Sequence, residues 1–245
     1  MKFLLESTKR TAQNSTVILP KNDFVYSFVE IVDYHNWQAG KEDDQVEFVI
    51  AEGFSKDQLT QSCVPVGSVQ FCLEWYRQMG VQTIRPLNIP EELDSLSKHS
   101  IIRTDNLPYS GRRYFGKVID NIKSEKNGWY TEYHGDEKMF FAEEVAGVCS
   151  EWRIFVCDGI IQGMKCYSGY PFIAPDMVYC NRVIKAVEKS KVARAYTLDL
   201  IVQGNGSTDI LELHDFFACG LYGFSDPIAI RRMAILTQGK LLGGM

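Results

Sequence analysis

The residues best suited to chemistry lie near the end of the chain, within residues 209–223. There an apolar, strand-like run carries Glu212, His214 and Asp215 into a loop punctuated by glycine, and Asp199 lies inside another apolar run, 13 positions before Glu212. A carboxylate inside an apolar strand loses its hydration, so each of these acids needs a partner. A hard divalent cation bound through oxygen is one such partner, most often Mg²⁺ held between carboxylates and substrate phosphates.

A turn of Gly, Asn, Gly and Ser at residues 204–207 joins the two apolar runs. This turn composition favours a hairpin, in which Asp199 and Glu212 would face the same side of adjacent antiparallel strands. The alternative is a hairpin whose two carboxylates lie on an exposed face. The leucines beside each acid fit both arrangements, because the alternation of a strand is the same in the two cases.

Six basic residues lie on or beside apolar strand-like runs, namely Arg103, Arg112, Arg113, Lys117, Arg153 and Lys165. Phosphate oxygens are bound by such donors, and arginine offers a planar, bidentate fork. For any one of them the alternative is ordinary surface charge. Arg153 differs because it lies inside an apolar strand, two positions after Glu151, so a structural Glu151–Arg153 ion pair is the alternative to a ligand role.

Residues 141–146 form an apolar strand that runs into a short acidic linker. The backbone of such a linker could hydrogen-bond the edge of an adenine, and a plain strand end is the alternative. The glycine-rich phosphate-binding motifs and the serine nucleophile elbow are absent from the sequence. His35, His99 and His134 are scattered over polar loops and do not make a metal set.

The composition of the 245 residues is that of a globular protein, with 45% apolar and 23% charged residues. A net charge of −5 argues against general nucleic-acid binding, which needs a basic face, and is compatible with a local site for an anionic small ligand. The seven cysteines form no Cys-x-x-Cys pair, so we expect reduced, buried thiols in a cytoplasmic protein. No signal peptide and no membrane-spanning segment is expected, because the apolar runs are too short.

The chain is expected to form two domains, with a boundary near residue 97. Residues 1–97 read as a small α/β domain with strands at 16–19 and 46–50 and a helix capped by Ser68. The apolar stripe predicted for that helix is Val69, Cys72, Leu73 and Tyr76. Two prolines break residues 85–93 into a linker.

Residues 98–245 read as an α+β domain that is rich in strands. Strands are predicted at residues 100–103, 112–119, 139–142 and 151–156. The dipeptide at Asp158 and Gly159 predicts a hairpin turn. Helices are predicted at residues 176–190 and from Asp226, with Pro227 in the first turn.

The order of these pieces resembles the ATP-grasp fold. The resemblance is closest to a clade common in phages and bacteria, which has a Ser-Glu-aromatic-Arg strand and an ending of Glu-x-Asn-Asp followed by Gly-Leu-Tyr-Gly. Here residues 150–153 read Ser-Glu-Trp-Arg, residues 212–215 read Glu-Leu-His-Asp and residues 220–223 read Gly-Leu-Tyr-Gly. Segments at residues 65–71 and 87–90 resemble the pre-grasp part, so the resemblance covers roughly residues 60–226.

This resemblance implies an α+β ATP-grasp domain, in which two subdomains hold ATP and Mg²⁺, preceded by a small α/β pre-grasp domain. Most members of the family activate a carboxylate as an acyl phosphate, which an amine then attacks. We therefore expect an ADP-forming, ATP- and Mg²⁺-dependent carboxylate–amine ligase. Its partners would be a small-molecule or peptide carboxylate and an amine acceptor, with neither a membrane nor a nucleic acid.

The resemblance also assigns site residues by motif. Arg103 and Arg113 occupy the positions of two phosphate-contacting lysines. The rest of the nucleotide site would comprise Lys117, Glu143, Glu144, Val145 and Glu151. The metal positions match Asp199 and Glu212, with His214 where the family usually has Asn. The residues expected to face the transferred phosphate or the acyl substrate are Arg153 and Lys165.

Two other functions remain open at this point. One is a nucleotide-binding or interaction protein that keeps the fold without turnover, which His214 and the two arginines favour, because neutral imidazole suits Mn²⁺ or Zn²⁺ better than Mg²⁺. The other is an ATP-dependent transferase acting on nucleic acid or protein, which the lack of a basic stripe disfavours. Substrate specificity is expected in the N-terminal domain and in residues 167–177.

Overall fold

The computed structural model describes residues 2–12, 15–21, 23–39 and 46–243. Its contacts divide the chain into two compact units, one of Met1–Gln82 with Phe216–Met245 and the other of Thr83–Asp215. The last segment thus belongs with the first, and the units divide the chain at places other than the boundary expected near residue 97. Within the described part of the chain, no helix is long and apolar enough to cross a membrane.

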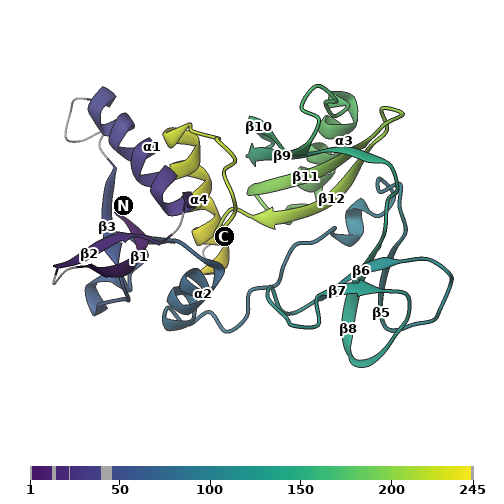
Figure 1. Cartoon of the computed structure of the whole chain (residues 1–245), viewed down its shortest axis with the longest axis horizontal. Coiled ribbons are helices and arrows are strands. Elements are labelled where there is room, and N and C mark those ends of the chain that lie inside the picture. The colour runs from purple at the N-terminus through teal and green to yellow at the C-terminus, as the bar shows by residue number, and fades with distance from the viewer. Residues whose placement is uncertain (1, 13–14, 22, 40–45, 244–245) are drawn as a thin grey trace. The chain divides into compact units, whose positions relative to one another are not determined.

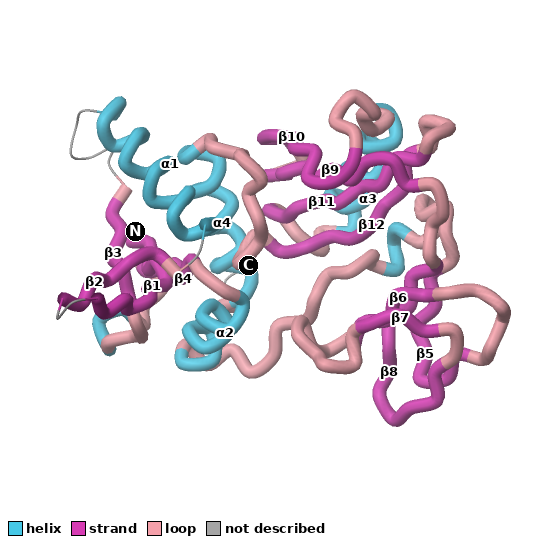
Figure 2. Tube along the Cα trace, viewed as in Figure 1, coloured by secondary structure: helices cyan, strands magenta, loops and turns pink. Residues whose placement is uncertain are grey.

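The first unit is a small sheet with three helices (Figures 1 and 2). Strand β1 pairs antiparallel with β2 and parallel with β3 and β4. The predicted strands at 16–19 and 46–50 are confirmed as β2 and β3. The elements of this unit are β1 (Lys2–Ala12), β2 (Ser15–Pro20), α1 (Asp23–Ala39), β3 (Glu47–Ala51), η2 (Lys56–Gln58), β4 (Cys63–Val66), α2 (Val69–Gln78) and α4 (Pro227–Leu241).

Helix α2 has the predicted cap and part of the predicted buried stripe, because Cys72 and Tyr76 are buried. The Ser68 hydroxyl accepts a hydrogen bond from the Phe71 amide at 3.3 Å, which confirms the N-cap. Val69 and Leu73 are only partly buried, whereas Phe71 is buried. The helix is turned this way because Phe71 packs against the ring of Phe54, with ring centroids 4.7 Å apart.

Helix α4 joins the first unit through its caps and its polar contacts. Its predicted start is confirmed, because the Asp226 carboxylate accepts from the amides of Ile228 and Ala229 at 3.0 Å. Near its end, Gln238 donates to the carbonyl of Cys63 in β4 at 2.6 Å. These contacts place the C-terminal helix against the N-terminal sheet.

The first sheet of the second unit has the order β10-β9-β11-β12, all antiparallel. Its hairpins turn at residues 158–159 and 204–207, as predicted, and α3 begins after its cap Asp176. Alternate residues of the strands, among them Ile154, Leu198 and Leu213, are fully buried against α3. The elements are β9 (Val148–Cys157), β10 (Ile160–Gly169), α3 (Met177–Ser190), β11 (Ala195–Gln203) and β12 (Thr208–Asp215).

The second sheet of this unit has the order β5-β8-β6-β7. Its core is small and mixes aliphatic and aromatic side chains, and contains Leu107, Tyr114, Val118, Met139 and Phe141. The sequence did not predict β7 or the full length of β8. The elements are η3 (Glu91–Leu93) in the predicted linker, β5 (Ile101–Leu107), β6 (Tyr114–Val118), β7 (Gly128–Tyr130) and β8 (Tyr133–Glu143).

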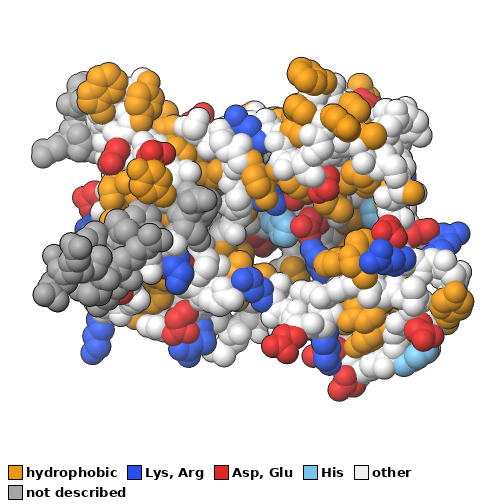
Figure 3. Space-filling view, viewed as in Figure 1, with side chains coloured by type: hydrophobic (Ala, Val, Ile, Leu, Met, Phe, Trp, Pro, Cys, Tyr) orange, Lys and Arg blue, Asp and Glu red, His pale blue; other side chains and the backbone are white. Residues whose placement is uncertain are grey.

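The surface and the thiols agree with the composition. On the face drawn in Figure 3, basic and acidic side chains are interspersed and do not form a basic stripe. The cysteines are free thiols, and all are buried except Cys149 and Cys166, which are partly exposed.

Candidate active site

Four charged residues form one row across the sheet β10-β9-β11-β12. Lys165 lies opposite Arg153, Arg153 opposite Asp199, and Asp199 opposite Glu212. Residues directly opposite each other in antiparallel strands point to the same face, so the row lies on the face that α3 does not cover. The prediction that the two acids face the same side of a hairpin is confirmed.

The centre of the row is a buried ion pair between Arg153 and Asp199, which are 6% and 2% exposed. The guanidinium donates to both carboxylate oxygens, at 2.8 Å from Nε and 2.7 Å from Nη2. Burial raises the pKa of Asp199, and the hydrogen bonds and charge of Arg153 oppose that rise. The sequence had suggested Glu151 as the acid partner, but a cross-strand neighbour lies closer than a residue two positions along the same strand.

Glu212, at the end of the row, is held by two side chains that carry protons. It forms an ion pair with Lys117, and its Oε1 lies 2.6 Å from Nε2 of His214. Burial raises the pKa of Glu212, but the hydrogen bond and charge of His214 and the charge of Lys117 outweigh it, so that the pKa falls to about 2. Glu212 is therefore an ionised acid at neutral pH.

Asp199, Glu212 and His214 each bring one ligand atom to a common place, and these atoms lie within 4.8 Å of one another. His214 follows Glu212 by two positions in β12, which puts both on one face of the strand. Two carboxylates and an imidazole suit a divalent metal ion, and the imidazole shifts the preference from Mg²⁺ toward Mn²⁺ or Zn²⁺. The residues present thus fit a divalent ion.

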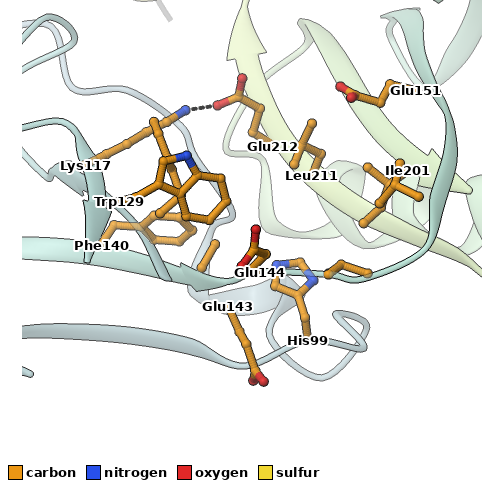
Figure 4. Close-up of a pocket in the computed structure, with 14 residues that line it drawn as sticks. His99, Lys117, Trp129, Phe140, Glu143, Glu144, Glu151, Ile201, Leu211 and Glu212 are labelled. Carbon is orange, nitrogen blue, oxygen red and sulfur yellow. Dashed lines mark hydrogen bonds and ion pairs between the residues drawn. The ribbon is translucent and has the colours of Figure 1, made fainter. Parts of the chain in front are cut away.

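One end of the row, at Glu212, lines a cavity of about 420 Å³ between the two sheets of the second unit. This volume is within the usual size of ligand pockets. Figure 4 shows Lys117 and Glu212 at one end of the cavity and His99 with Glu144 at the other. Bulky apolar side chains lie between these ends. The lining residues are His99, Phe115, Lys117, Trp129, Phe140, Ala142, Glu143, Glu144, Val145, Val148, Glu151, Ile201, Leu211 and Glu212.

The linker after β8, predicted as an adenine-binding segment, lines this cavity. The Glu143 amide donates to the carbonyl of Ser100 at 3.0 Å, and the Glu144 amide donates to the carbonyl of Arg113 at 2.8 Å. The Glu143 carboxylate is turned away from the cavity, where Arg112 donates to it at 2.8 Å (Figure 4). Of the two carboxylates of this segment, that of Glu143 is thus directed away from the cavity, while Glu144 lies beside His99 in its lining.

The structure places some of the basic residues predicted to contact phosphate in the cavity lining and others outside it. Lys117 lines the cavity. Arg113 does not line it, but its guanidinium lies 4.4 Å from the ring centroid of Trp129, which does, and donates to Glu144 at 3.3 Å. Arg103 does not line the cavity. It donates to the carboxylate of Asp94 at 2.8 and 2.9 Å and to the carbonyl of Ile89 at 2.6 Å.

Glu151 and Tyr167 adjoin the charged row. The Tyr167 hydroxyl is hydrogen-bonded to Glu151, and its ring centroid lies 5.9 Å from the guanidinium of Arg153. Burial raises the pKa of Tyr167, and the charges of Asp199 and Glu151 raise it further. Tyr167 therefore remains a neutral phenol that can donate a hydrogen bond.

Two of the bulges in this sheet lie beside the charged row. In β10 the pairing shifts between Cys166 and Ser168, and in β12 it shifts between Ile210 and Glu212. Tyr167 and Leu211 are the extra residues. A bulge exchanges the faces of the residues beyond it, which brings Asp209 onto the same face as Glu212 although they are three positions apart.

Sequence reasoning missed the pair formed by His99 and Asp209. Nδ1 of His99 lies 2.7 Å from a carboxylate oxygen of Asp209, and both side chains are buried. His99 was placed among loop residues, but it lines the cavity. The signal that could have found the pair is Asp209 itself, which is a third acid in the same apolar hairpin as Asp199 and Glu212.

Comparisons with known proteins concern the fold of the chain. A search among curated protein sequences gives no match. The D-cycloserine synthetase DcsG is similar in structure, at 14% identity over 98% of this chain and all of the other, with a TM-score of 0.51. D-alanine–D-alanine ligase from Bacillus anthracis matches at 9% identity over 99% of this chain and 98% of the other, with a TM-score of 0.49. Likeness at such identity concerns the fold alone.

A comparison of the sequence with models of protein families shows the family to which the chain belongs. The family model for the ATP-grasp domain, R2K clade family 2, matches residues 109–231, which is half of the chain. That range contains the charged row, the linker after β8 and most of the cavity lining. The chain belongs to the ATP-grasp proteins, in family 2 of the R2K clade.

Proposed function

We propose that this protein is an ATP- and divalent-metal-dependent ligase that joins a carboxylate to an amine. The observation that carries the proposal is the row Lys165, Arg153, Asp199 and Glu212 on the open face of one sheet, beside a cavity of about 420 Å³. Phosphoryl transfer depends mainly on positioning and on charges around the transferred phosphate. A row with cations at one end and acids at the other supplies such charges.

In this proposal the nucleotide lies along the cavity. Its base occupies the apolar part, where the carbonyl of Glu143 and the amide of Val145 offer hydrogen bonds. Its phosphates lie toward Lys117 and Arg113. The charge of Lys117 now neutralises Glu212, and in the complex it would be shared with phosphate oxygens.

Asp199, Glu212 and His214 would hold the divalent ion, since their ligand atoms already lie within 4.8 Å of one another. When bound, the ion neutralises charge on the phosphates. Arg153 has a second role in keeping Asp199 ionised and fixed in place.

The acyl substrate would bind toward the other end of the row, at Arg153 and Lys165. A substrate carboxylate oxygen attacks the terminal phosphorus, the bond from that phosphorus to ADP breaks, and an acyl phosphate forms. An amine then attacks the acyl carbon, phosphate leaves, and the amine proton passes to solvent. The two cations stabilise the negative charge that gathers on the phosphate and the acyl oxygen. We propose a small-molecule or peptide carboxylate as the donor and a cytoplasmic location.

The proposal is tested by nucleotide binding and by turnover. Calorimetry should show that purified protein binds ATP only when Mg²⁺ or Mn²⁺ is present, and that Asp199→Asn with Glu212→Gln abolishes this binding. Asp136→Asn, which changes an exposed acid, is the matched control and should bind as the parent does. A parent protein that does not bind ATP with either metal ion refutes the proposal.

A non-catalytic ATP-binding protein is the second candidate, and two observations favour it. His214 stands where the family usually has Asn, and Arg103 is engaged by Asp94 away from the cavity. A metabolite extract added with ATP separates the two candidates. Release of ADP and phosphate, with a new condensation product in the mass spectrum, supports the ligase. ATP binding without release in any extract fraction supports the binder.

A further inference from the structure

The carboxylate of Asp209 is fixed by an unusual number of donors for a buried acid. It accepts hydrogen bonds from the amide of Lys98 at 3.0 and 3.1 Å, from the amide of Ile210 at 2.8 Å and from the Tyr179 hydroxyl at 3.1 Å. Burial raises the pKa of Asp209, but the hydrogen bonds that it accepts from His99 and from the amides of Lys98 and Ile210 lower it overall. Asp209 is therefore an ionised acceptor.

An ionised acceptor fixes the hydrogen on the neighbouring imidazole. Nδ1 of His99 lies 2.7 Å from Oδ2 of Asp209, so Nδ1 carries the hydrogen and donates it. In a neutral ring the other nitrogen, Nε2, is then an acceptor. With the described residues, Nε2 makes no hydrogen bond, while the ring lines the cavity.

The position of His99 places this acceptor at the base end of the cavity. The carbonyl of Ser100, the next residue, accepts the amide of Glu143 in the proposed base-binding linker. His99 and Glu144 lie together in Figure 4, at the end opposite Lys117 and Glu212. The bulge at Leu211 makes this possible, because it turns Asp209 to the same face as Glu212.

We propose that His99, held by Asp209, selects the purine base of the nucleotide. Its Nε2 accepts a hydrogen bond from the amino group at C6 of adenine and is opposed by the carbonyl at C6 of guanine or hypoxanthine. The inference rests on the proposed function, because it assumes that the cavity holds a nucleotide.

Replacement of the amino group at C6 of the base by a carbonyl tests the proposal most directly. ITP differs from ATP in having a carbonyl with a protonated N1 in place of the amino group, and the triphosphate is the same. A buried acceptor facing an acceptor loses one hydrogen bond and leaves two groups unpaired, so ITP and GTP should bind the parent protein roughly tenfold to a hundredfold more weakly than ATP. The measurement is calorimetric titration with each nucleotide at pH 8 in the presence of Mn²⁺.

Two variants separate base selection from triphosphate binding. His99→Ala should reduce the preference for ATP over ITP by about tenfold relative to the parent, while the backbone of Glu143 and Val145 retains the rest, with little change in ITP affinity. In Asp209→Asn the new amide can donate to Nδ1, which moves the ring hydrogen to Nε2, and the preference should then turn toward ITP. His134→Ala, at an exposed histidine bonded to Asn106, is the matched control and should keep the parent preference.

The outcomes are distinct. A parent protein that binds ATP and ITP equally overturns the inference and leaves the proposed function standing, and so does a His99→Ala variant with the parent preference. If His99→Ala does not fold, the parent comparison and Asp209→Asn still decide. A parent protein that binds none of the nucleotides overturns the proposed function and the inference with it.

Discussion

The sheet β10-β9-β11-β12 and the sheet β5-β8-β6-β7 line the same cavity with different side chains. The first places a row of charges on its open face, with the ion pair of Arg153 and Asp199 almost fully buried. The second places its ion pairs at the surface, as between Arg112 and Glu143, and gives the cavity aromatic rings such as Trp129. The first sheet thus carries the buried charges, and the second contributes aromatic rings together with Lys117 of β6, which pairs with Glu212 of the first sheet.

The largest effect should come from breaking the buried pair. Arg153→Ala leaves the Asp199 carboxylate buried without its bidentate partner, and we expect a loss of about 3–5 kcal/mol in the free energy of unfolding, measured with urea. Arg112→Ala breaks the exposed pair of the other sheet and should cost less than about 1 kcal/mol. Equal losses in the two variants would remove the distinction between the sheets.

A double replacement sharpens this result. Arg153→Met combined with Asp199→Leu removes both charges and fills similar volume, so most of the stability lost in the single variant should return. The charges of the row would then be retained for chemistry and not for stability. A double variant as unstable as the single one would instead assign the row a structural role.

The next effect concerns Asp209 and depends on pH. Asp209→Asn should reduce the free energy of unfolding by about 1.5–3 kcal/mol at pH 7, because hydrogen bonds to a charged acceptor are lost. The folded pKa of Asp209 lies below the ordinary value of about 3.9. The unfolded chain therefore takes up the proton first as the pH falls, and the stabilisation is full above about pH 5 and is lost as the pH falls through the folded pKa.

Thermal unfolding at several pH values measures how the stabilisation by Asp209 depends on pH. The difference between Asp209→Asn and the parent should shrink steadily between about pH 5 and pH 3. Asp136→Asn, at an exposed acid, provides the control and should follow the parent throughout. A difference that does not change with pH would mean that Asp209 contributes by packing and not by charge.

The smallest effect probes the aromatic sheet. A Cβ on Gly116 would lie 2.7 Å from a ring carbon of Phe141 and 2.8 Å from one of Tyr130, so Gly116→Ala should cost roughly 1–3 kcal/mol by overpacking. Gly128 lies directly opposite Gly116 in β7, and a Cβ added to it would meet no atom within 4 Å. Gly128→Ala is thus the control, and urea unfolding should show it within about 0.5 kcal/mol of the parent.

Local signals in the sequence predicted much of the fold. Both hairpins of the first sheet were predicted from their turn residues, and the start of α4 from a proline at the first turn. The facing of Asp199 and Glu212 followed from one of these hairpins. These features depend on residues that are close in sequence, so the chain alone carries them.

The pairing of side chains across the sheet could not be predicted in the same way. Which acid meets Arg153 depends on the register of β9 against β11, and no local signal sets that register. The bulges have the same origin, because each one is defined by a neighbouring strand. His99 and Asp209 are 110 positions apart, and only the fold brings them together.

The two bulges also determine how this chain can change length without losing its site. Loss of Leu211 would restore simple alternation in β12 and leave Asp209 and Glu212 on one face, and loss of Tyr167 would do the same for β10. Loss of a residue away from a bulge would turn every side chain beyond it to the opposite face. Among homologues, single-residue gaps in these outer strands are therefore expected at or directly beside positions 167 and 211.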